Sequence, residues 1–192
     1  MTDNSRQPDA CKIDIVESYK HYAPPIRVRA VVERLVARMP DRYKWGLKTI
    51  VLTDSASISR NERNRKVRRN GKRYLKSECL GMYFQKWKGE PAWIRLIIDN
   101  ILKDCPWYVS RIPIVQDIVI GQVLYHELGH HIHATSKPEY KDKEDVADRW
   151  SGKLMVAYMR KQYWYLTPIF VTVAHIMKFF RRIRAKFKRY KT

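Results

Sequence analysis

The amino-acid sequence predicts an α+β fold built on a small mixed β-sheet, and the order of its segments leads to this prediction. One amphipathic helical segment comes first, and three short segments rich in β-branched and aromatic residues follow it. Such residues are typical of strands. A long segment with few charges begins at Pro113 and has the continuity of a buried helix. Strands that gather in one part of the chain and helices in another favour an α+β fold.

The first helix is predicted over 24–40, where two prolines stand at the start and valine and leucine recur at helical spacing. Strands are predicted within 46–54, 79–87 and 92–100, and the turn sequence KGEP separates the last two. Between the first two strands, residues 59–76 contain few apolar side chains. We therefore expect a basic loop there.

Helices make up the rest of the predicted chain. The segment from Pro113 predicts a helix of about 22 residues, roughly 33 Å long at the rise of an α-helix. Residues 136–142 predict a turn, and residues 143–166 a further helix that Pro168 breaks or kinks. The predicted organisation is a partly disordered N-terminal segment, one domain and a basic amphipathic C-terminal helix, over 1–22, 23–165 and 166–192.

The composition fits one globular domain with an appendage. The 192 residues are too few for two ordinary domains, and a hydrophobic content of 45% argues against disorder. Cys11, Cys79 and Cys105 have no paired spacing, so neither a disulfide framework nor a thiolate metal site is predicted. The N-terminus lacks a signal-peptide pattern, and the 16 uncharged residues from Gln162 to Met177 are too few to span a bilayer. We therefore expect a cytoplasmic protein.

The charge distribution predicts an attraction to polyanions. Lys and Arg number 39 against 19 Asp and Glu, which gives a formal net charge of +20. Residues 59–76 hold nine of these cations with Glu62 as the only acid, and further cations fill the polar faces of 178–191. Both segments could bind nucleic acid or an anionic membrane surface through phosphates, at a membrane or at the nucleoid. The alternatives are a solvated loop, and a helix that packs on the domain or on a second copy.

The segment His126-Glu127-Leu128-Gly129-His130 predicts a metal centre. His126 and His130 are four residues apart, so on a helix both imidazoles project from one face and can reach a single ion. Glu127 is adjacent to His126, which sets its carboxylate beside the ion, where it can take a proton from a water held there. His133 is about 10.5 Å from His126 along the helix axis and is too far to share the ion. His131 points to another face and is expected to be polar or partly exposed.

The next helix offers the third ligand. Glu144 and Asp148 are four residues apart and share a face, so Glu144 could bind the ion while Asp148 accepts a hydrogen bond from a ligating histidine. The alternative is that both are solvated acids that balance neighbouring cations, and Asp145 and Glu139 are reserve candidates. A separation well over ~6 Å between Glu144 and the imidazole nitrogens would exclude it as a ligand, because zinc–ligand bonds are about 2 Å long.

These residues resemble the gluzincin branch of the zincin metallopeptidases. The pattern of two histidines with Glu127 and the later Glu144-x-x-Ala147-Asp148 is similar to minimal gluzincins, and Ala147-Asp148-x-Trp150 is similar to ImmA/IrrE-like bacterial proteases. The resemblance covers roughly residues 80–160. It implies a zincin-like fold and a catalytic Zn²⁺. The short separation between His130 and Glu144 departs from larger gluzincins and implies a compact catalytic unit.

The resemblance also implies groups that bind substrate. An edge strand should pair with extended substrate backbone, and residues 92–99 are the candidate; the alternative is that they form a plain core strand. A Tyr or His should stabilise the developing oxyanion, and His133, Tyr140 and Tyr158 are the candidates. The predicted function is that of a zinc metalloendopeptidase acting on a protein or peptide substrate. The alternative is a non-catalytic zinc-containing protein that associates with nucleic acid or an anionic membrane through its basic segments.

Overall fold

A computed structural model of the chain describes residues 12–69, 72–135 and 143–166, with side chains 67–74 left out of the description. The chain divides into two compact units, Met1–Met155 and Val156–Thr192, and the boundary lies inside the last described α-helix. The predicted C-terminal helix over 166–192, with its cations at 178–191, lies almost entirely outside the described residues. The first unit contains the sheet and the predicted site.

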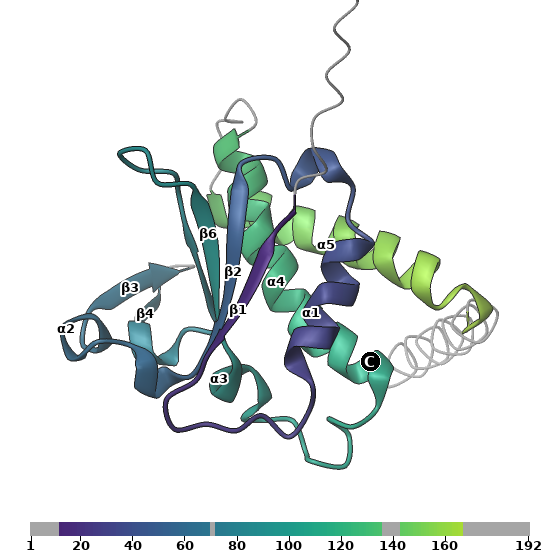
Figure 1. Ribbon diagram of the computed structural model, residues 1–192, viewed down its shortest axis with the longest axis horizontal. Helices are drawn as coiled ribbons and strands as arrows, with labels where there is room; N and C mark the ends of the chain where they lie inside the picture. Colours follow the sequence, from purple (N-terminus) through teal and green to yellow (C-terminus); the bar gives the residue numbers. More distant parts are fainter. Residues whose placement is uncertain (1–11, 70–71, 136–142, 167–192) are drawn as a thin grey trace, which may run out of the picture. The chain divides into compact units, whose positions relative to one another are not determined.

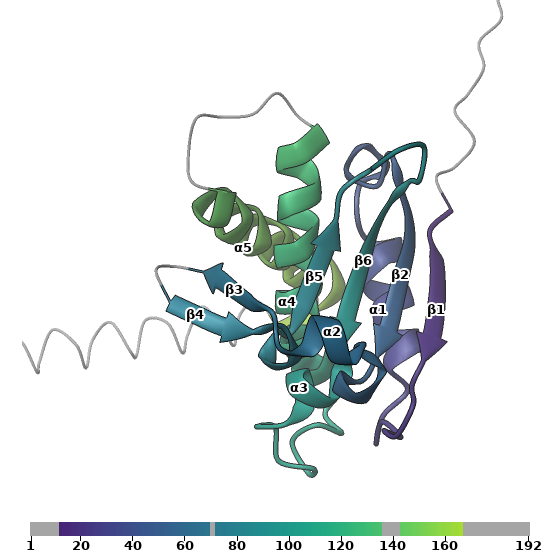
Figure 2. The ribbon, with the colours of Figure 1, turned by 90° about the vertical axis from the view of Figure 1, so that its left-hand side faces the viewer.

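A four-stranded mixed sheet forms the centre of the first unit (Figure 1), in the order β1-β2-β6-β5, with all four strands labelled in Figure 2. Strands β1 (Asp14–Ser18), β2 (Leu47–Thr53) and β6 (Ala92–Ile97) are parallel, and β5 (Gly81–Phe84) runs antiparallel to β6. The predicted α+β class and the small mixed sheet are therefore confirmed. The zincin-like character of the fold stays a prediction.

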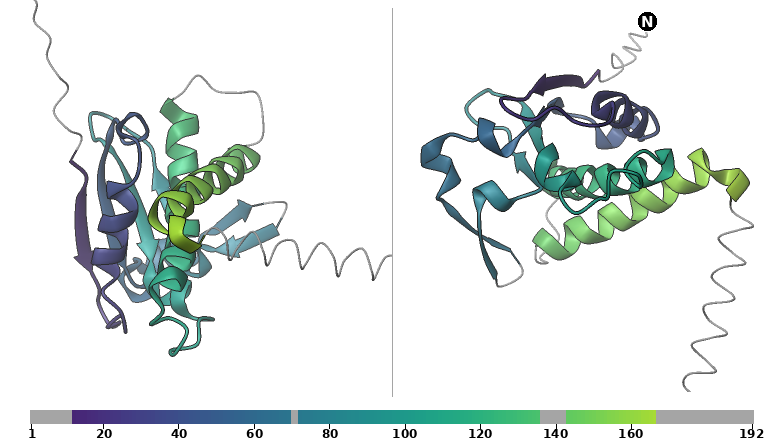
Figure 3. Two further views of the ribbon diagram at one scale, coloured as in Figure 1. Left: turned by 90° about the vertical axis from the view of Figure 1, so that its right-hand side faces the viewer. Right: turned by 90° about the horizontal axis from the view of Figure 1, so that it is seen from below.

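The longer helices cover one face of this sheet. Helices α1 (Val28–Ala37) and α4 (Pro113–Thr135) lie on the same side of the strands, as Figures 2 and 3 show from opposite directions. Alternate residues of β2 and β6 point to the helices and are fully buried, because side chains alternate between the faces of a strand. The core consists of these side chains and the apolar sides of α1 and α4, and includes Ile50, Leu52, Ile94, Leu96, Val32, Leu35, Ile120, Leu124 and Leu128.

Two polar contacts hold α1 against α4. The carboxylate of Asp117 is fully buried in the first half of α4 and forms an ion pair with Arg34 of α1. About two helical turns further along α4, the Tyr125 hydroxyl donates a hydrogen bond of 3.1 Å to the Leu35 carbonyl oxygen. These contacts fix how α4 lies along α1.

The structure corrects three sequence-based expectations about the fold. Strand β1 lies inside the segment 1–22, so the predicted boundary before residue 23 cuts through the sheet. Strand β6 is internal, between β2 and β5, so the segment 92–99 provides a core strand, the second alternative, and not the edge strand that the resemblance implies. The segment 59–76 is structured: it contains the short helix α2 (Arg60–Arg63) and a hairpin of β3 (Lys66–Arg69) and β4 (Lys72–Leu75).

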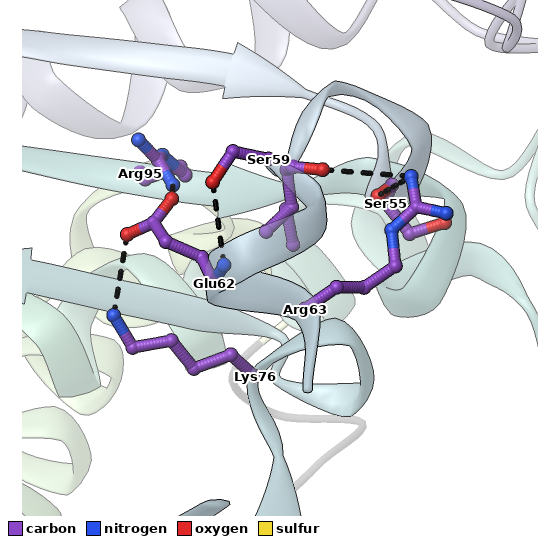
Figure 4. A network of polar contacts seen from close by, with 7 residues as sticks. Ser55, Ser59, Glu62, Arg63, Lys76 and Arg95 are labelled. Carbon is purple, nitrogen blue, oxygen red and sulfur yellow. Dashed lines mark hydrogen bonds and ion pairs between the residues drawn. The ribbon is translucent and has the colours of Figure 1, made fainter. Parts of the chain in front are cut away.

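Some of the basic side chains of 59–76 form ion pairs and hydrogen bonds within the protein (Figure 4). Glu62 of α2 lies 3.3 Å from the Lys76 ammonium and 3.5 Å from the Arg95 guanidinium, which joins α2 to β6. Arg63 donates hydrogen bonds to the carbonyl oxygens of Ser55 and Ala56. The prediction that this segment binds a polyanion is not tested by these contacts and stays a prediction.

Candidate metal centre

The second half of α4 buries polar side chains in an otherwise apolar helix. His126 is 6% exposed, Glu127 5% and His131 1%. Burial of such groups is unfavourable unless each has a polar partner or an ion to bind. The helix continues without a break through these positions, so the four-residue spacing of His126 and His130 becomes one face of α4.

Helix α5 (Lys143–Gln162) brings an acid to that face. The Nε2 atom of His126 lies 3.5 Å from Glu144 Oε2, and the Nε2 atom of His130 lies 3.6 Å from Glu144 Oε1. One ligand atom from each residue can be chosen so that all three lie within 4.8 Å of one another. Ligands that bind one tetrahedral zinc at about 2.0–2.2 Å are about 3.3–3.6 Å apart. The two histidine–glutamate separations match this spacing, whereas separations within the group reach up to 4.8 Å, so the side chains would have to close slightly around an ion. The separation that would exclude Glu144 is not observed.

Asp148 orients the first histidine. The Nδ1 atom of His126 lies 2.8 Å from Asp148 Oδ1. A carboxylate accepts hydrogen bonds, so Nδ1 carries a proton in this contact, and when the ring is neutral its lone pair is on Nε2, the nitrogen nearer to Glu144. This is the tautomer that binding through Nε2 requires, and it is the role that the sequence predicts for Asp148. The side chain of Asp148 is 59% exposed, whereas that of His126 is 8% exposed.

A glycine allows the two helices to approach closely. A Cβ atom added to Gly129 would lie 2.7 Å from both the Cα and the carbonyl oxygen of Ala147. Real Cβ atoms do not approach backbone this closely, so α5 could not keep its position against a larger residue at 129. Gly129 lies just before His130, and Ala147 is three residues after Glu144. The helix crossing at Gly129 and Ala147 therefore sets the distance from Glu144 to the histidines.

His131 has a structural role on the opposite side of α4. Of the two expected states, polar or partly exposed, the first holds: the ring makes polar contacts and is buried. Its Nε2 atom lies 3.0 Å from the Trp45 carbonyl oxygen, which can only accept, so Nε2 carries the proton. Nδ1 is then the acceptor for the Tyr83 hydroxyl, 3.2 Å away. Burial lowers the pKa of His131 and so favours the neutral ring. The hydrogen bond to Trp45 raises the pKa and opposes this effect only in part.

The remaining candidates are not part of the three-residue group. His133 is half-buried, and Asp145 is exposed in the first turn of α5. Tyr140 and Glu139 lie outside the described residues. Tyr158 belongs to the second compact unit. The residue that would stabilise an oxyanion therefore stays open between His133, Tyr140 and Tyr158.

Sequence analysis did not single out Gly129, Tyr83 or Trp45. The glycine lies within the histidine motif, but its packing against Ala147 depends on how two helices cross. Tyr83 and the backbone of Trp45 meet His131 only after three separate segments have come together. A usable signal was the unbroken helical run through residue 131, which predicts that a histidine on the sheet side needs polar partners.

Comparison with protein families, with curated proteins and with solved structures finds no match to this chain. The resemblance to gluzincins therefore depends on the residues of the motif alone. Among the helices in the described ranges, none combines the length and apolar character that crossing a bilayer requires.

Proposed function

We propose that this chain is a zinc-dependent metallopeptidase in which His126, His130 and Glu144 hold the ion. The observation that carries the proposal is the approach of Glu144 to both imidazoles, at 3.5 and 3.6 Å. Two histidines and one glutamate are a donor set of catalytic zinc sites, which keep one position for water or substrate. Nitrogen and carboxylate ligands without a thiolate suit Zn²⁺ at such a site.

Glu127 is the proposed general base. Zinc, when bound, lowers the pKa of a coordinated water to about 7 and polarises a carbonyl group. Glu127 accepts a proton from the water that attacks the peptide carbonyl carbon, and then delivers it to the amine nitrogen as the C–N bond breaks. Its position next to His126 and its burial support this role, because a carboxylate shielded from water interacts more strongly with nearby charge.

The edge strand β5 is the proposed place for the substrate backbone. The Ile97 amide donates to the Leu80 carbonyl oxygen, so residues 80, 82 and 84 form the hydrogen-bonded pairs with β6. The amides and carbonyls of Gly81 and Tyr83 consequently point to the outer edge of the sheet. An extended peptide could add there as a further strand. This replaces residues 92–99 as the candidate substrate strand.

The test compares the purified wild-type chain with Glu127→Gln. Both should contain one zinc per chain, and hydrolysis of a casein-like or unfolded polypeptide should fall about 10²–10⁴-fold in the variant. A chelator should remove wild-type activity, and added zinc should restore it. Glu33→Gln, a change in an exposed acid of α1, serves as the matched control and should retain full activity. Equal turnover by Glu127→Gln would exclude the proposed base.

A further inference from the structure

Strand β5 lies beside helix α4 (Figure 2). Gly81 and Tyr83 pair with Leu96 and Ile94, whose side chains are buried under the helices, so both residues face α4. Two residues of a strand span about 6.8 Å, and four residues of a helix about 6 Å. Positions two apart in β5 can therefore contact positions four apart in α4.

Two contacts join β5 to α4, and the first, between Tyr83 and His131, fixes β5 against the helix. The Tyr83 hydroxyl lies 3.2 Å from His131 Nδ1, and the two rings meet edge to face with centroids 5.5 Å apart. The same imidazole reaches the Trp45 carbonyl oxygen through Nε2. His131 is thus held by partners from two other segments. A shift of β5 by one residue would remove Tyr83 from this contact and turn its side chain to the other face.

The second contact places Gly81 against Glu127, four residues before His131. A Cβ atom added to Gly81 would lie 2.8 Å from Glu127 Cγ, 3.0 Å from Glu127 Oε1 and 2.9 Å from Val123 Cγ1. The backbone of Gly81 does not have the positive φ of Gly46 and Gly89, so its conformation would accept any residue. Space alone requires glycine at this position.

From this contact we infer that Gly81 is a positioning residue for the carboxylate of Glu127, an inference that rests on the proposed function. Because Gly81 has no side chain, Glu127 can occupy the space beside the strand. The strand backbone and Val123 then limit the conformations of Glu127. Because the amide and carbonyl of Gly81 also point to the outer edge of the sheet, one residue would hold the base beside the backbone of a bound substrate. Such preorganisation is where small displacements affect catalysis most.

The experiment is steady-state hydrolysis by Gly81→Ala, with zinc content and thermal unfolding measured on the same preparation. A methyl group at 81 should displace Glu127 and lower kcat about 100-fold, the loss expected for a misplacement near 1 Å. Zinc content should stay at one per chain, because Glu127 is not a ligand. Gly152→Ala is the matched control, since an added Cβ at 152 meets nothing within 4 Å, and it should retain wild-type kcat.

A second comparison separates positioning from a general structural effect. If Gly81→Ala acts through Glu127, it should cause no further loss of activity when Glu127 is already Gln. Should the methyl group prevent folding, Val123→Ala with Gly81→Ala removes one of the two clashes and keeps the one with Glu127. That pair should still lose kcat relative to Val123→Ala alone.

The outcomes distinguish this inference from the proposed function. Hydrolysis that depends on Glu127 but is unchanged by Gly81→Ala would overturn only the role of Gly81. The same fold loss from Gly81→Ala in the wild-type and Glu127→Gln backgrounds would also overturn it. A wild-type chain without Glu127-dependent hydrolysis would overturn both proposals.

Discussion

The two halves of α4 bury polar groups in different ways. The first half buries the carboxylate of Asp117 and pairs it with the guanidinium of Arg34 from the neighbouring helix. The second half buries His126 and Glu127 and turns two imidazoles toward Glu144. Burial of a charge is costly in both places, and a fixed cation offsets it in the first half. In the proposed site a bound ion would do so in the second. The stability of the metal-free chain should therefore depend on the ion pair in the first half of α4. Metal binding should depend on the second half.

The largest expected effect comes from breaking the ion pair of the first half. Arg34→Met removes the guanidinium from a fully buried carboxylate and should lower the free energy of unfolding by about 3–5 kcal/mol. The measurement is urea unfolding in the presence of a chelator. Arg29→Met is the control, because Arg29 and Glu33 form an exposed pair whose loss should cost under about 1 kcal/mol. Equal losses in the two variants would contradict the role assigned to the first half.

A smaller effect is expected where α5 crosses the second half. In Gly129→Ala the new methyl group meets the backbone of Ala147, so α5 must move and carry Glu144 away from the histidines. Zinc affinity should fall at least about tenfold, and the free energy of unfolding of the metal-free chain by about 1–3 kcal/mol. Competition with a chromogenic chelator measures the first quantity. Gly152→Ala, a change in α5 where an added Cβ meets nothing within 4 Å, should leave zinc affinity unchanged. Unchanged affinity in Gly129→Ala would show that the crossing does not set the site.

The comparison extends to Asp54, a buried carboxylate at the end of β2 that is satisfied by protein donors. Burial alone would raise its pKa, but hydrogen bonds donated by Ser57 and by the amides of His21 and Lys20 outweigh this and lower the pKa from 3.8 to about 2. A pKa lowered in the folded state contributes stability above about pH 4 and loses it as the pH falls toward 2. The contribution is about 2 kcal/mol.

Acid unfolding tests this structural carboxylate separately from the metal site. Between pH 5 and pH 2, wild-type stability in a chelator should fall by more than that of Asp54→Asn, and the difference should approach about 2 kcal/mol. The same pH dependence in both proteins would show that Asp54 is not the group responsible. Zinc should not change the difference, because Asp54 is not among the proposed ligands.

Most elements of the first unit follow from local sequence patterns, and the exceptions have a physical reason. Helices α1 and α4 and strands β2, β5 and β6 show apolar periodicity or β-branched runs, and they occur within the predicted segments. Strand β1 has a single half-buried position and four exposed ones, so it has no clear apolar pattern. The segment of β3 and β4 is highly charged, so no strands are predicted there, although the sequence Asn70-Gly71 is typical of a hairpin turn.

The order of strands and the packing of the site depend on contacts between distant segments. From the helical period, His126 and His130 are predicted to share one face of a helix, and Glu144 and Asp148 one face of the next helix. The structure brings these four residues together. Local sequence cannot show that β5 lies outside β6, or that Gly81 faces Glu127. Both features follow from which strands pair and how closely the elements pack. A local sequence pattern contains neither kind of information.

The central claim is that Glu144 completes a metal site with His126 and His130, and zinc titration of Glu144→Ala tests it most directly. The wild-type chain should bind one zinc, and Glu144→Ala should bind it at least about tenfold more weakly. Asp145→Ala, a change in the adjacent exposed acid, should bind zinc like the wild type. An affinity unchanged by Glu144→Ala, or lowered only by Asp145→Ala, would contradict the account.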